Sequence, residues 1–317
     1  MKHRLITLFG AGAVWLTGSA FSGRTADLLP EADGAAAAMQ QQPATPDQPE
    51  LPLPAIPPTL RQPAQRAGWL IRHFWDEVDF RDPLRSHNEA LMEQHFVNFV
   101  SLFPHADPTD HTPAVDTLMR RAEADGAAFR LVAGLAEKYL FETDSPLRDD
   151  ALYLLFLDRI VEAPVLDRYE RMRPQVQQEA LRKNRPGMTA ADFPYVTREG
   201  ERTTLHQTET SGPLLLIFYD PTCGHCQEVM AELRRDSQVA EAVASGELEV
   251  LAICVDGTAE ALKVSSASLP ETWLTGYEEG TIYDEELYAL RSMPTLYLLD
   301  AQKRILRKEP TPATLFE

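Results

Sequence analysis

The spacing of hydrophobic residues changes once along the chain, near residue 185. Before that point, from about residue 65, hydrophobic side chains recur every three or four positions, the spacing of one face of a helix. The stripes run over residues 70–78, 96–103, 132–140 and 152–160, with a fifth over Val165, Tyr169, Met172 and Val176. We expect them to form the core of an all-α helical bundle domain over residues 65–185.

Two dipeptides inside this region have the pattern of helix starts. Thr112-Pro113 and Ser145-Pro146 each offer an N-cap side chain followed by proline at the first helical position. Their separation, from 112 to 145, matches the period of a helical-hairpin repeat. Two instances are too few to define an array, so a simple bundle is the prediction and a repeat array the alternative.

The pattern becomes that of strands after Arg185-Pro186-Gly187. A hairpin is expected where residues 192–196 and 203–205 flank a turn at 198–201. The continuous apolar runs 214–219 and 248–254 fit strands buried on both faces. One helix is expected from the cysteine pair at 223–226 to about Ser237, and two more over 260–267 and 284–290. A hairpin of 295–300 and 304–307 is expected to follow. Alternating strands and helices predict an α/β domain over residues 186–317.

The first 20 residues have the pattern of an export signal. Lys2, His3 and Arg4 precede an uncharged apolar stretch over 5–16, and small residues follow up to Ala20. The stretch is shorter than the roughly 20 apolar residues of a spanning helix, so we expect cleavage after Ala20. An uncleaved membrane anchor is the alternative. Residues 21–64, rich in Pro, Ala and Gln, are predicted to be a linker.

Composition and net charge argue against some classes of binding partner. With 44% hydrophobic and 25% charged residues, the chain has the composition of a soluble protein. Its net charge of −18 argues against nucleic acid or an anionic membrane surface as the main partner. No later stretch is apolar enough to span a bilayer, so no transmembrane domain is expected in the mature chain.

The three cysteines are too few for a disulfide scaffold and have the pattern of a redox pair with one additional thiol. Cys223-Gly224-His225-Cys226 follows a buried strand and opens a helix. A sulfur at a helix start meets unpaired backbone N–H groups and the positive end of the helix dipole, which favour the attacking thiolate. We therefore expect Cys223 to be the nucleophile and Cys226, one turn on, to resolve the mixed disulfide.

The two residues between the cysteines add to this picture. Gly224 lets a partner chain approach the sulfur, and His225 adds positive character beside the thiolate. That favours the reduced form, so the pair should be more oxidising than thioredoxin, whose potential is about −270 mV.

Other uses of these residues are less consistent with the pattern. A zinc site would need two more ligands, and Cys254 and His206 lie in other predicted elements, so no metal is expected. Cys254, on a buried strand, is expected to be a core residue. The remaining histidines lack ligand spacing and are interpreted as ordinary surface or core residues; they are His73, His87, His95, His105 and His111.

The segment LLLIFYDPTCGHCQEVM, residues 214–230, resembles the active-site segment of the thioredoxin superfamily and is most similar to the TlpA/ResA-like thiol-disulfide oxidoreductases. Residues 291–297, RSMPTLY, resemble that family's later signature. The resemblance covers about residues 187–309 and implies a thioredoxin-like fold, a central mixed sheet flanked by helices. The part before it is similar to an uncharacterised helical domain found ahead of such modules.

The resemblance also implies site residues. Pro294 would be a cis-proline facing the cysteines, and Met293, with Thr295, Thr222 and Gly224, would contact the partner. The family needs no cofactor beyond the redox-active disulfide Cys223–Cys226. At the position of a buried proton-accepting acid stands Ile217. Asp220, His225 or Glu228 are the alternatives, and the sequence does not choose among them.

The sequence therefore favours an exported thiol-disulfide oxidoreductase of the periplasm or cell envelope. Its partners would be protein thiols or disulfides and an upstream electron donor. A thiol peroxidase is a weaker alternative, because Asp220 stands where such enzymes usually have Thr or Ser. A third alternative is a partner-binding helical protein that carries a redox-sensitive module.

Overall fold

The computed structural model describes residues 51, 53–255 and 257–316. The predicted export signal and most of the predicted linker lie outside these residues. All of the described residues belong to one compact unit. Within the described ranges, no helix is both long and apolar enough to cross a membrane.

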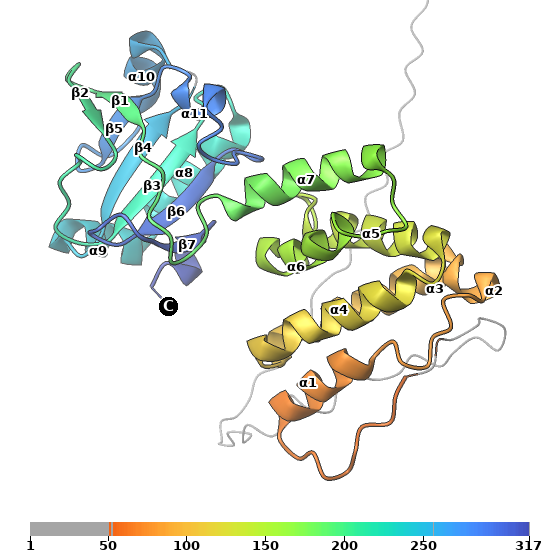
Figure 1. Cartoon of the computed structure of the whole chain (residues 1–317). Coiled ribbons are helices and arrows are strands. Elements are labelled where there is room, and N and C mark those ends of the chain that lie inside the picture. Colours follow the sequence, from red (N-terminus) through yellow and green to blue (C-terminus); the bar gives the residue numbers. More distant parts are fainter. Residues whose placement is uncertain (1–50, 52, 256, 317) are drawn as a thin grey trace, which may run out of the picture. The chain divides into compact units, whose positions relative to one another are not determined.

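The first part of this unit is helical (Figure 1). Its α-helices are α1 (Pro63–His73), α2 (Pro83–Ser86), α3 (Glu89–Val100), α4 (His111–Ala122), α5 (Gly126–Leu140), α6 (Asp150–Ile160) and α7 (Arg168–Arg182). Aspartates cap several of them, and the Asp149 side chain accepts from Leu152 N at the start of α6. Helix α4 follows Asp110 as its N-cap residue and α6 follows Asp149, so the caps predicted at Thr112 and Ser145 are wrong.

The first four predicted stripes pack into one core. Trp75, Phe96, Phe99, Phe129 and Phe156 are among its fully buried side chains. The fifth stripe is a wrong prediction, because Tyr169, Met172 and Val176 on α7 are 79%, 55% and 66% exposed.

Helix α7 turns a polar side inward instead. The Gln177 amide donates to Glu137 at 2.6 Å and accepts from the Tyr153 hydroxyl at 2.9 Å. Buried amides are tolerated when they are bonded in this way, and Leu181 packs beside them.

The second part is built on a seven-stranded mixed sheet with the order β2-β1-β5-β4-β3-β6-β7. The strands are β1 (Pro194–Thr197), β2 (Arg202–Thr204), β3 (Leu214–Tyr219), β4 (Glu249–Cys254), β5 (Leu274–Tyr277), β6 (Thr295–Leu299) and β7 (Ile305–Lys308). Strand β3 runs parallel to β4 and antiparallel to β6. The predicted mixed sheet is confirmed.

Helices lie on both faces of this sheet: α8 (Gly224–Arg235), α9 (Ser237–Ser245), α10 (Ala259–Ser266) and the short α11 (Thr281–Asp284). Alternate residues of β3 point to opposite faces. Leu215 and Ile217 pack with α8 and α9, while Leu216 and Phe218 pack with Ile282 on the other side. Strand β3 is buried on both faces, as its apolar run predicted.

Three elements differ from the sequence prediction in this region. Helix α9 and strand β5 were not predicted. Asp236 ends α8 and caps α9 by accepting from Gln238 N and Val239 N. The helix predicted over 284–290 is wrong, because α11 is followed by Glu286 at a positive φ of 48°.

His95 in the helical core gives a testable pH dependence. Burial against Phe74 and Trp75 lowers the pKa of His95 from its usual 6.5 to about 4. Between about pH 6.5 and pH 4, His95 is therefore protonated in the unfolded chain and neutral in the folded chain. The free energy of unfolding should fall by about 2 kcal/mol from this group between pH 7 and pH 5. Urea unfolding at both pH values should show this loss for the wild type and a smaller one for His95→Leu; equal losses would contradict it.

Candidate functional site

A short turn carries the chain from the buried end of β3 to the start of α8. Asp220 forms it, because its carboxylate accepts from Thr222 N at 2.7 Å and from Thr222 Oγ1 at 2.8 Å. The Asp220 carbonyl accepts from Cys223 N at 3.2 Å. The turn sets Cys223 at the N-cap of α8 in extended backbone conformation.

The two sulfurs of the pair lie in different environments. Cys223 is half-buried, and its Sγ accepts a hydrogen bond from Cys226 N at 3.4 Å. Cys226 is 1% exposed and packs into the core beneath β3. Burial raises the pKa of the Cys226 thiol from its usual 9 to about 12. At neutral pH Cys226 is therefore a protonated thiol, whereas Cys223 is the sulfur that a partner can reach.

The turn before β6 stands against Cys223. The Met293–Pro294 peptide bond is cis, as the resemblance implies. Cys223 Sγ donates to the Met293 carbonyl across 3.8 Å. The Thr295 side chain is 1% exposed and donates to the Ser292 carbonyl at 2.6 Å, so it holds the turn from within. Its contact with a partner stays a prediction.

Two further predicted contact residues, Thr222 and Gly224, and the predicted tuning residue His225 lie beside the pair. Thr222, Gly224 and His225 are exposed. A Cβ atom added at Gly224 would meet no atom within 4 Å, which leaves space for a partner chain. His225 Nδ1 lies 3.7 Å from Glu228 Oε2, and both side chains are largely exposed.

A hollow of about 730 Å³ opens beside the pair. Asp220 and Met293, which flank Cys223, line it together with Gly257, Tyr283 and Asp284. The hollow therefore reaches two residues that contact Cys223, although neither cysteine lines it.

Sequence reasoning missed Glu278, which follows β5 and is fully buried. Its Oε2 accepts from Gly280 N at 2.9 Å and from Ile282 N at 3.2 Å, while its buried Oε1 has no hydrogen-bond partner. Burial raises the pKa of this carboxyl. Glu278 lies in a polar stretch just after a strand that was not predicted, so nothing in the sequence indicated that its carboxyl would be buried.

The alternative zinc site would need Cys254 or His206 beside the pair. Cys254 is fully buried on β4, and His206 Nε2 is hydrogen-bonded to the Ala190 carbonyl at 2.8 Å. In the described part of the chain, no group of three His, Cys, Asp or Glu side chains is arranged to hold a metal ion.

A solved structure of a thioredoxin-like protein from Bacteroides caccae matches most of the chain. It is 32% identical, with a TM-score of 0.78, and the match covers 83% of this chain and 95% of that one. The chain belongs to the thioredoxin-like proteins. Because the match covers so much of it, this thioredoxin-like chain shares part of its helical region, as well as the sheet, with the B. caccae protein.

Other comparisons cover parts of this thioredoxin-like chain. The model of a domain of unknown function, DUF5106, matches residues 31–184. A conserved protein of unknown function from Bacteroides fragilis is 34% identical over 42% of this chain and 96% of its own, with a TM-score of 0.39. The thioredoxin domain of a thiol-disulfide oxidoreductase from Bacteroides vulgatus is 17% identical over 42% of this chain and 93% of its own, with a TM-score of 0.37. No curated protein matches the chain significantly.

The unequal burial of the cysteines predicts an order of alkylation. Iodoacetamide should label Cys223 of the native reduced protein first and Cys254 last, because Cys226 and Cys254 are buried. Peptide mapping by mass spectrometry at timed quenches measures the three rates. Cys223→Ser should remove the fast phase. Rapid labelling of Cys254 would contradict the assignment.

Proposed function

We propose that this protein is an exported thiol-disulfide oxidoreductase of the TlpA/ResA-like type, acting on disulfides or dithiols of other proteins. The observation that carries the proposal is the different exposure of the two sulfurs. Cys223 is reachable at a helix start against the Met293 carbonyl, and Cys226 is a buried thiol one turn away.

The helix start favours negative charge on Cys223 Sγ. The first turn of a helix carries backbone N–H groups without intrahelical partners, and the Cys226 N–H of α8 donates to the sulfur directly. The thiolate attacks one sulfur of a partner disulfide, and the partner's other sulfur leaves as a thiolate. The product is a mixed disulfide between Cys223 and the partner.

Cys226 then completes the exchange. Its thiol loses a proton and attacks Cys223 Sγ, so the partner leaves as a dithiol and Cys223–Cys226 becomes a disulfide. Two electrons have passed to the partner, and an upstream dithiol donor must return them. The same steps in reverse oxidise a dithiol. With a pKa of about 12, Cys226 needs a base for its proton; Asp220, His225 and Glu228 remain the candidates.

Three residues support the partner's approach in this proposal. Met293 and the cis Pro294 hold one side of the nucleophile, and Gly224 leaves the other side open. His225, exposed on the first turn of α8, adds positive character that favours the reduced pair.

The proposed location is the periplasm or cell envelope. Its support is the charged start, apolar stretch and small residues of the first 20 positions. In such a compartment the Cys223–Cys226 disulfide could persist between turnovers.

A second candidate function is partner binding by the helical region, favoured by the exposed stripe of Tyr169, Met172 and Val176 on α7. Scattered apolar side chains are common on surfaces, but three on one helix face form a patch. Redox exchange and partner binding are compatible, and one experiment separates them.

Cys226→Ala should trap partners as mixed disulfides, because the resolving thiol is gone while Cys223 still attacks. Expressed with its signal, it should give higher-mass species on non-reducing gels that dithiothreitol dissolves, with Cys223 in the linkage by mass spectrometry. The double variant Cys223→Ser/Cys226→Ala is the control and should trap nothing. If it retained the same partner after reduction, binding would be the primary role; if Cys226→Ala formed no adduct, the redox proposal would fail.

A further inference from the structure

The Arg291 side chain links the turn before β6, which contacts Cys223, to the helical region. Arg291 stands two residues before Met293, and its side chain is only 15% exposed. Its guanidinium lies 4.1 Å from the ring centroid of Phe141, and Nη1 donates to the Phe141 carbonyl at 3.0 Å. Nη2 donates to the carboxylate of Asp150, the first residue of α6.

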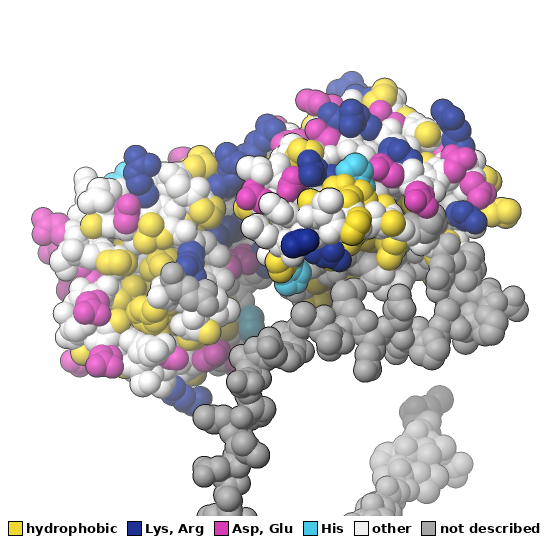
Figure 2. Space-filling view, turned by 90° about the horizontal axis from the view of Figure 1, so that it is seen from below, with side chains coloured by type: hydrophobic (Ala, Val, Ile, Leu, Met, Phe, Trp, Pro, Cys, Tyr) yellow, Lys and Arg dark blue, Asp and Glu magenta, His cyan; other side chains and the backbone are white. Residues whose placement is uncertain are grey.

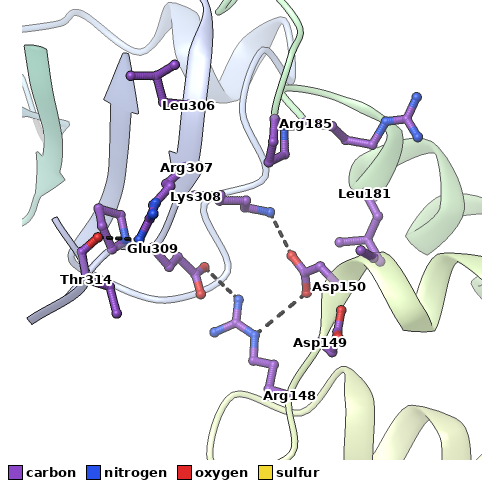
Figure 3. A pocket seen from close by; sticks show the side chains of 13 residues that line it. Arg148, Asp149, Asp150, Leu181, Arg185, Leu306, Arg307, Lys308, Glu309 and Thr314 are labelled. Carbon is purple, nitrogen blue, oxygen red and sulfur yellow. Dashed lines mark hydrogen bonds and ion pairs between the residues drawn. The ribbon is translucent and has the colours of Figure 1, made fainter. Parts of the chain in front are cut away.

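Asp150 holds this arrangement from the other end. Its second carboxylate oxygen accepts from Lys308 Nζ at 2.8 Å, an ion pair drawn in Figure 3. Burial opposes ionisation of this carboxyl, but Lys308 and Arg291 outweigh it and hold the pKa of Asp150 below its usual value. One carboxylate therefore binds a residue on each side of the turn in sequence, Arg291 before it and Lys308 after it.

These contacts fix a part of the chain that also touches the nucleophile. Lys308 on β7 is the register partner of Tyr297 on β6, the strand that begins directly after Pro294. The Met293 carbonyl accepts from Cys223 Sγ. Arg291 is thus held by stacking, one backbone acceptor and one carboxylate, a planar arrangement that suits a guanidinium better than an ammonium.

We propose that Arg291, anchored by Asp150 and Phe141 of the helical region, is a positioning residue that sets the Met293–Pro294 turn over Cys223 for a partner chain. The inference rests on the proposed function and deepens it. It gives the helical region a role in the redox reaction through the turn, without any contact between that region and the sulfurs.

The same cluster contains a matched control. Arg148 is also 15% exposed and donates to Glu309 at 2.6 Å (Figure 3). Its guanidinium contacts the segment after β7 through Glu309, and its Nε also lies 3.8 Å from Asp150 Oδ1, the oxygen to which Arg291 donates. Removing Arg148 tests the loss of its two ion pairs in the cluster, with Glu309 and Asp150, while Arg291, Asp150 and Phe141 all remain.

The test compares full-length Arg291→Met, Asp150→Asn and Arg148→Met with the wild type, using a peptide disulfide and oxidised glutathione as substrates. Arg291→Met and Asp150→Asn should raise KM for the peptide at least fivefold, with kcat and the glutathione rate within twofold, because only the peptide uses the turn. Arg148→Met should change all values less than twofold, and Arg291→Lys should restore part of the loss.

Hydrogen exchange of residues 288–299 tests positioning without activity. Exchange there should be faster in Arg291→Met and Asp150→Asn than in Arg148→Met. Because exchange is measured along the whole chain, it also shows whether a variant is only partly folded. Unchanged peptide KM with unchanged exchange, or equal effects of Arg148→Met, would overturn the proposal. A wild type inactive on both disulfides would instead contradict the proposed function, and the exchange result would still decide whether Arg291 holds the turn.

Discussion

The end of β3 places Cys223, and the chemistry depends on that junction. Six consecutive residues of β3 are buried, so the strand is fixed between β4 and β6. The Asp220 turn then connects this strand directly to the first turn of α8. The outcome is a sulfur that accepts a backbone N–H at the helix start and a second sulfur that the same helix carries into the core. A longer connection would fix neither environment.

The parts of this arrangement that are local in sequence could be predicted from it. The uninterrupted apolar run before Cys223 indicated a doubly buried strand, and the spacing of the two cysteines placed one outside and one inside. The change of hydrophobic period near residue 185 separated the helical region from the sheet. Four stripes of the helical core followed from periodicity, because large apolar side chains with that spacing had to share one face.

The parts that depend on distant partners could not be predicted. The α7 stripe has the right period, yet Gln177 finds Glu137 and Tyr153, so the polar side faces inward. Arg291 and Asp150 lie 141 positions apart, and neither has a local pattern that announces an ion pair. On the face shown in Figure 2, acidic and basic side chains are interspersed, and a net charge of −18 identifies no particular pair. The proposed coupling of the helical region to the redox site therefore comes from tertiary contacts alone.

The most direct test of the central claim is a redox titration of the full-length protein against glutathione, with the Cys223–Cys226 disulfide quantified by mass spectrometry. The account predicts one reversible two-electron transition with a midpoint above about −270 mV, the value for thioredoxin, unchanged in Cys254→Ala. A disulfide that never forms or never opens, or a midpoint at or below that value, would contradict it.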